Sequence, residues 1–173
     1  MPTVNPVLGR LPDGQLIPHL EGHERLILWR KGVVLESNIP NVGKLSASGV
    51  LHVTDQRLFF IAETKKSRPD LGSLEVSFSD LCTAPDFEQP IFGANYLSLK
   101  SHDSSTTKLK FYEGGCNTLV PSVFALYQDS MKRNTPKQFS NINFGQGSYA
   151  FADPSDPTVF YISQPQGAVP ILK

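Results

Sequence analysis

Residues 48–62 read Ser-Gly-Val-Leu-His-Val-Thr-Asp-Gln-Arg-Leu-Phe-Phe-Ile-Ala, and this stretch constrains the fold more than any other. Up to the turn, apolar residues occupy alternate positions, at Leu45, Ala47, Gly49, Leu51 and Val53. Such alternation is typical of a strand with one apolar and one largely polar face. Residues 54–56 break the pattern with side chains that can bond their own backbone, and a dense apolar run follows. The stretch predicts a tight antiparallel hairpin.

About seven short strands are predicted in all. Those outside the hairpin fall at residues 24–36, 74–78, 81–87, 96–101 and 107–112. Gly32 indicates a bulge in the first of them, and Pro85 weakens the strand at 81–87.

A single amphipathic helix follows the last predicted strand. After the turn at Gly114-Gly115, apolar residues recur at intervals of three and four up to Met131. Asn117 or Thr118 is the expected N-cap, with Pro121 in the first turn. Many short strands imply a barrel or a sandwich, and a lone helix must bury its apolar stripe on an open end or face of the sheet.

The predicted domain occupies residues 24–133. Residues 1–23 are rich in proline and glycine and are expected to form an irregular leader. Residues 134–173 contain Pro, Gly, Ser and Gln with few charges, and are expected to be a mostly disordered tail. Within that tail, residues 158–162 could add a strand to a sheet edge, either on this barrel or on a partner.

Composition excludes several functions. The 16 basic and 16 acidic residues give a net charge of zero, so direct nucleic-acid binding is not expected. Two distant cysteines, Cys82 and Cys116, do not suggest a disulfide framework, and with no signal peptide or apolar span they favour a cytoplasmic or nuclear protein. No catalytic or metal-binding motif stands in the sequence, so we expect neither enzymatic activity, a cofactor nor a metal.

Two motifs resemble a known family. Gly49-x-Leu51-x-x-Thr54-x-x-Arg57-Leu-x-Phe60 resembles the hairpin of GRAM domains. Residues 89–96, Gln-Pro-Ile-Phe-Gly-Ala-Asn-Tyr, with Leu109-x-Phe111 and Gly114-Gly115, resemble the WW-domain-binding protein family. The resemblance covers residues 24–132.

This resemblance implies a pleckstrin-homology-like (PH-like) fold: a mainly β, partly open barrel of two near-orthogonal antiparallel sheets, capped by one C-terminal α-helix. It also implies an adaptor or transcriptional coactivator whose tail presents Pro-Pro-x-Tyr motifs to WW domains. This chain contains no Pro-Pro pair, so WW-domain proteins are partners by resemblance only.

A basic cluster is the first candidate site. Lys65, Lys66 and Arg68, with Lys44, could contact inositol phosphates or an anionic, phosphoinositide-containing membrane surface. The alternative is a solvated polar loop in which Glu63 and Asp70 offset the positive charge.

Two segments are candidate protein-interaction sites: Phe92, Asn95 and Tyr96 in the family-like loop, and Val159, Phe160 and Tyr161 in the tail. For the loop, the alternative is a buried plug with Ile91 and Phe92 pointing inward. Arg57 is interpreted as a structural residue that bonds turn carbonyls or a nearby acid. His52 is interpreted as an ordinary polar residue.

Overall fold

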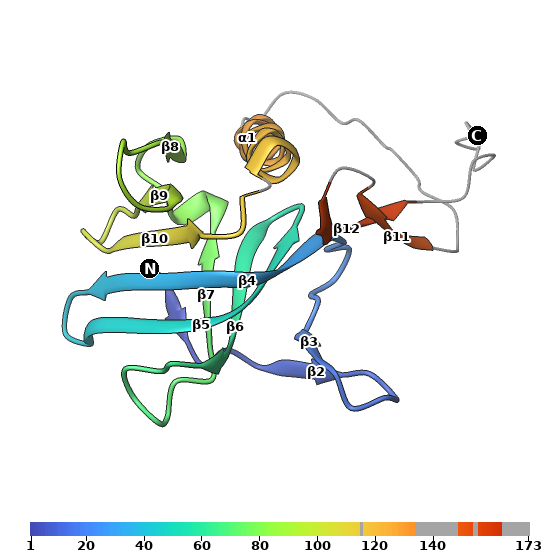
Figure 1. Cartoon of the computed structure of the whole chain (residues 1–173), viewed down its shortest axis with the longest axis horizontal. Coiled ribbons are helices and arrows are strands. Elements are labelled where there is room, and N and C mark those ends of the chain that lie inside the picture. Colours follow the sequence, from blue (N-terminus) through green and yellow to red (C-terminus); the bar gives the residue numbers. More distant parts are fainter. Residues whose placement is uncertain (115, 134–148, 154–155, 164–173) are drawn as a thin grey trace.

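The computed structural model describes residues 1–114, 116–133, 149–153 and 156–163. Most of its strands belong to one antiparallel sheet (Figure 1). The strand order is β1-β7-β6-β5-β4-β10-β9-β8. The bounds are β1 Thr3–Val4, β4 Leu26–Ile39, β5 Gly43–Thr54, β6 Arg57–Thr64, β7 Ser73–Ser77, β8 Asp86–Glu88, β9 Asn95–Lys100 and β10 Thr106–Phe111. A separate hairpin pairs β2 (Leu8–Arg10) with β3 (Leu16–Pro18), and another pairs β11 (Tyr149–Asp153) with β12 (Asp156–Ser163).

The predicted hairpin is confirmed as β5 and β6, which pair from Val53↔Leu58 outward. Leu45, Ala47 and Leu51 point into the core, as the alternation predicts. The bulge predicted at Gly32 is also present, because the β4–β5 register shifts between Arg30 and Val33. The strand expected at 81–87 shrinks to β8 and a single bridge from Leu81 to Ser101, after a 3-10 turn at Phe78–Asp80.

The helix α1 (Cys116–Arg133) covers one end of the sheet (Figure 1). It buries Leu119, Val120 and Val123, and the Tyr127 ring meets the Phe78 ring edge-on with centroids 6.3 Å apart. Because the helix begins at Cys116, Pro121 lies in its second turn, so the prediction of a first-turn proline is wrong. No described helix is long and apolar enough to cross a lipid bilayer.

The prediction of an irregular leader is wrong for three segments of residues 1–23. β1 pairs with β7 through Thr3↔Glu75 and Val4↔Leu74, and β2 pairs with β3. The Asn5 side chain accepts bonds from the Gly72 and Ser73 amides, at 2.7 and 3.1 Å. Strands of two or three residues are too short to show periodicity, so pairing with distant partners defines them.

The N-terminal segment also lies against the outer face of β6. β3 contacts β6, and Arg57 donates to the carbonyl of His19, just after β3. On this face Val50, His52, Phe59 and Ile61 are all buried. The second face of β5, on which the sequence places Val50 as the one apolar exception, is exposed or half-buried at Lys44, Ser46 and Ser48 but buried at Val50 and His52.

Within the predicted tail, β11 and β12 form a hairpin, and β12 includes the strand that the sequence allows at residues 158–162. The other tail residues, 134–148, 154–155 and 164–173, lie outside the described residues. β12 adds to the edge of β4, so the structure selects the first of the two alternatives for residues 158–162.

Gly49 is expected to tolerate no side chain. A Cβ at this position would lie 2.0 Å from the carbonyl oxygen of Ile61, which is backbone and cannot rotate away. We expect Gly49→Ala to lower the free energy of unfolding by about 2 kcal/mol, measured by urea denaturation. Gly72→Ala is the matched control, because its Cβ would meet only the Asn5 side chain, at 3.3 Å. Equal losses of stability in both variants would show that the Ile61 carbonyl is not what excludes a side chain at position 49.

Candidate functional site

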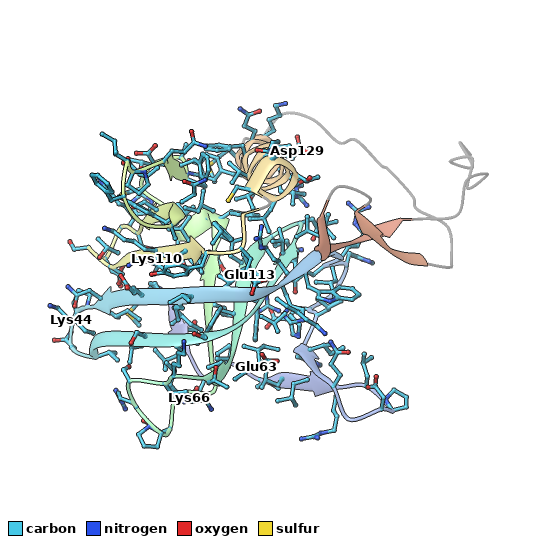
Figure 2. All side chains as sticks on the ribbon, in the orientation of Figure 1. Lys44, Glu63, Lys66, Lys110, Glu113 and Asp129 are labelled. Atoms are coloured by element: carbon cyan, nitrogen blue, oxygen red, sulfur yellow. The ribbon has the colours of Figure 1, made fainter. Side chains whose placement is uncertain are left out.

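The predicted basic cluster gathers at one end of the sheet. Lys65, Lys66 and Arg68 lie exposed in the connection from β6 to β7, and Lys44 lies exposed at the start of β5. Ser67 holds this connection to β5: its amide donates to the Ser46 carbonyl at 2.7 Å, and its hydroxyl accepts from the Ser46 amide at 2.8 Å. Figure 2 shows Lys44 and Lys66 at this end.

Acidic neighbours reduce the charge of this cluster. Arg68 forms a two-pronged pair with Asp70, with distances of 2.6 Å from Nη2 and 3.1 Å from Nε. These hydrogen bonds lower the pKa of Asp70 and raise that of Arg68. Glu63 lies exposed near the end of β6. The arrangement supplies three exposed lysines, which suits weak, salt-sensitive attraction of anions rather than a formed anion pocket.

The loop between β8 and β9 exposes two large apolar side chains. Ile91 is 93% exposed and Phe92 is 91% exposed. The interpretation of this loop as a buried plug is therefore wrong. Directly after Phe92, Gly93 has a φ of 101°, which favours glycine.

The other two predicted loop residues lie on the sheet. Asn95 begins β9 opposite Phe111, and Tyr96 lies between Glu88 and Lys110 in the ladder. The Lys108 ammonium is 4.8 Å from the centroid of the Tyr96 ring, a cation–π contact. Phe92 is thus the most accessible member of the predicted trio, and the structure adds Ile91 beside it.

The segment that leads into Ile91 and Phe92 is acidic. Asp86 and Glu88 are exposed on β8, which leads into the loop. From residue 82 to residue 99 the sequence contains no Lys or Arg. The apolar pair therefore projects from a segment with a local negative charge, unlike the lysine-bearing connection from β6 to β7.

The predicted tail residues lie in β12. Val159 pairs with Arg30, Phe160 with Trp29, and Tyr161 with Leu28 of β4 (Figure 1). These backbone positions connect the tail to the N-terminal part of β4. They lie on the same edge as β10, beyond the residues with which β10 pairs.

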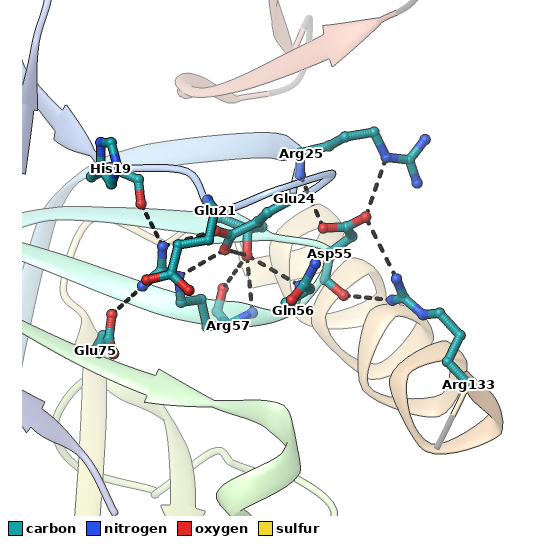
Figure 3. A network of polar contacts seen from close by, with 10 residues as sticks. His19, Glu21, Glu24, Arg25, Asp55, Gln56, Arg57, Glu75 and Arg133 are labelled. Atoms are coloured by element: carbon teal, nitrogen blue, oxygen red, sulfur yellow. Dashed lines mark hydrogen bonds and ion pairs between the residues drawn. The ribbon is translucent and has the colours of Figure 1, made fainter. Parts of the chain in front are cut away.

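Arg57 is a structural residue, as predicted. Its guanidinium donates to Glu24 at 2.7 and 2.8 Å, to the His19 carbonyl at 2.6 Å, and to Glu75 (Figure 3). Burial alone would raise the pKa of Glu24, but hydrogen bonds from Arg57 and Thr54 outweigh it and lower that pKa. Because its guanidinium is paired with two carboxylates and a carbonyl, Arg57 is not available to a ligand.

Sequence reasoning missed the turn residue Asp55. Its carboxylate accepts from the Arg25 amide at 3.0 Å and lies 3.6 Å from Nη1 of Arg133, whose Nη2 donates to the Asp55 carbonyl at 2.6 Å (Figure 3). The hairpin turn thereby ties the start of β4 to the end of α1. Sequence spacing carries no signal for this contact, because the three residues are far apart in the chain.

No group of three or more His, Cys, Asp or Glu side chains among the described residues could hold a metal ion. A cavity of about 10 Å³ among Leu35, Leu51 and Phe60 is apolar and too small for a ligand.

Comparison with known proteins identifies the fold class. Among solved structures, the Vps36 N-terminal PH domain superposes with a TM-score of 0.53 and 15% sequence identity, covering 72% of this chain and 93% of that one. The chain therefore has a PH-like fold, as the strand order and the capping helix predict. No family model matches the chain. No curated protein matches it either.

Proposed function

We propose that this chain is a non-catalytic interaction module that docks on a protein partner through the β8–β9 loop. The observation that carries the proposal is the exposure of Ile91 and Phe92 side by side. A single exposed apolar side chain is ordinary, but two large ones at a loop tip form a patch that a partner can bury. Aromatic residues are enriched in protein interfaces, and a few such anchors supply most of the binding energy.

The acidic flank of the loop defines the partner's chemistry. Asp86 and Glu88 would be repelled by an anionic membrane but attracted by a basic rim. We therefore propose that the partner presents an apolar pocket bordered by Lys or Arg.

The resemblance to the WW-domain-binding protein family supports an adaptor, of the transcriptional coactivator type, acting in the cytoplasm and nucleus. Residues 24–133 would form its binding unit. The absence of a Pro-Pro pair argues against a WW domain as the receptor of the tail, because that groove needs a polyproline segment.

A second candidate function is peripheral binding to phosphoinositide-containing membranes. The exposed Lys44, Lys65 and Lys66 at one end of the sheet favour it. The zero net charge and the Arg68–Asp70 pair weaken it.

We expect Ile91→Ser with Phe92→Ser to weaken partner binding at least about tenfold, a typical loss for an interface anchor. The partner is first captured by a photo-crosslinking amino acid in place of Phe92, then purified and titrated by calorimetry. The urea midpoint should not fall, because both side chains are already exposed. The control is Lys65→Glu with Lys66→Glu, which should bind the partner normally.

Unchanged affinity of the serine variant for the crosslinked partner would contradict the proposal. Co-sedimentation with phosphatidylinositol phosphate vesicles tests the second function with the same proteins. Binding lost in the glutamate variant and kept in the serine variant would favour the membrane role.

A further inference from the structure

The edge of β4 is divided between two partner strands. β10 pairs with the C-terminal part, from Phe111↔Val33 to Thr106↔Asn38. Its ladder stops at the bulge, where Gly32 has a φ of 69°. Leu28, Trp29 and Arg30 lie beyond the bulge, and β12 pairs with them.

This short edge is also fixed to the barrel by other contacts. On its other side, Leu28, Trp29 and Arg30 pair with Val53, His52 and Leu51 of β5. The buried Arg30 guanidinium donates to the Gly114 carbonyl and lies 4.9 Å from the centroid of the Phe111 ring. Residues of the barrel other than the tail therefore position this edge of β4.

The β11–β12 hairpin is joined to the sheet by β12 alone. Within the described residues, β11 pairs only with β12, while β12 pairs with β11 and with three positions of β4. A bare strand edge presents unpaired amides and carbonyls that favour addition of another strand. A ladder of three residue pairs closes this edge. So short a ladder can open and allow another strand to take the place of β12.

We infer that the β4 edge at Leu28, Trp29 and Arg30 is a strand-acceptor site that can exchange its own β12 segment for the β12 segment of a second copy of the chain. Residues 134–148 separate α1 from β11, and an extended chain of that length spans roughly 50 Å. Such a connection permits both arrangements. Within one molecule the effective concentration of β12 is on the order of millimolar, so exchange between copies requires a high protein concentration.

The test uses a fluorescent peptide of residues 149–163 and the full chain carrying Phe160→Pro. Proline removes an amide donor and disturbs both ladders of β12, which empties the acceptor edge. We expect the peptide to bind this variant at least about tenfold more tightly than it binds the wild-type chain, whose edge is filled. The same peptide with Phe160→Pro is the control and should bind neither protein. Equal binding to both proteins, or none to the variant, would overturn the inference.

Disulfide trapping separates the two arrangements in the intact fold. The chain carries Trp29→Cys and Phe160→Cys, which face each other in the ladder, and has Cys82 and Cys116 replaced by serine. Opposed Cβ atoms in such a pair are about 4.5–5.5 Å apart. We expect an intramolecular disulfide at low concentration and a growing share of disulfide-linked dimer as concentration rises. A chain that never forms a dimer would overturn exchange between copies, and one that forms neither product would overturn the site. The inference does not depend on the proposed role of Ile91 and Phe92.

Discussion

Replacing Arg57 with methionine is expected to lower the free energy of unfolding by about 3–5 kcal/mol. The substitution keeps much of the side-chain volume but leaves the Glu24 carboxylate, whose side chain is 1% exposed, without its guanidinium partner. It also removes the bond to the His19 carbonyl and the pair with Glu75. The loss is large because a buried charge without a partner keeps its desolvation cost.

Urea denaturation followed by fluorescence measures this loss, and Arg68→Met is the matched control. Arg68 also forms a two-pronged carboxylate pair, with Asp70, but both side chains are exposed, so its midpoint should barely move. Adding Glu24→Gln to Arg57→Met should restore part of the stability, because the stranded charge is then gone. Similar midpoint shifts for Arg57→Met and Arg68→Met would show that the Arg57 network contributes no more than a surface pair.

The sequence predicts the barrel well because its strands carry strong local signals. The alternation around Leu45 and Leu51, the polar turn at residues 54–56 and the helical period from Leu119 depend on neighbours in the chain. Each of these patterns arises because one face of a strand or helix is apolar, and the fold buries that same face. The bulge at Gly32 was predictable for the same reason, since glycine in a strand marks an irregularity.

What the sequence does not predict depends on contacts between distant segments. β1 has two residues, and only the edge of β7 makes them a strand. His52 is buried between Trp29 of β4 and Phe59 of β6, and no pattern in residues 45–53 encodes this burial.

The candidate site illustrates the same limit. Hydrophobicity predicts that Ile91 and Phe92 should be buried, and this expectation fails because their side chains are 93% and 91% exposed. Hydrophobicity shows only that Ile91 and Phe92 would be more stable when buried. An exposed apolar patch is a place where such burial requires a second molecule. The basic cluster was predictable in composition, but the pairing of Arg68 with Asp70 required the structure.

His52 should make the fold sensitive to acid. Its ring is 2% exposed on the outer face of β5, opposite Phe59 of β6, and burial lowers its pKa from 6.5 to about 4. The unfolded chain therefore takes up a proton near pH 6.5 that the folded chain does not accept until about pH 4. Stability from neutral His52 is fully present above pH 6.5 and is lost progressively as the pH falls toward 4.

We expect the free energy of unfolding to fall by roughly 2.5 kcal/mol between pH 7.5 and pH 4.5 through His52 alone, since one unit of pKa corresponds to about 1.36 kcal/mol. Urea denaturation at several pH values measures this slope in the wild type and in His52→Leu, which cannot take up the proton. The difference between the two proteins isolates His52 from the carboxylates, including Glu24, whose pKa is lowered by hydrogen bonds from Arg57 and Thr54. His102→Leu, in the exposed β9–β10 connection, is the matched His-to-Leu control. If His52→Leu keeps the wild-type slope, the burial of neutral His52 does not cause the sensitivity to acid, and the prediction is wrong.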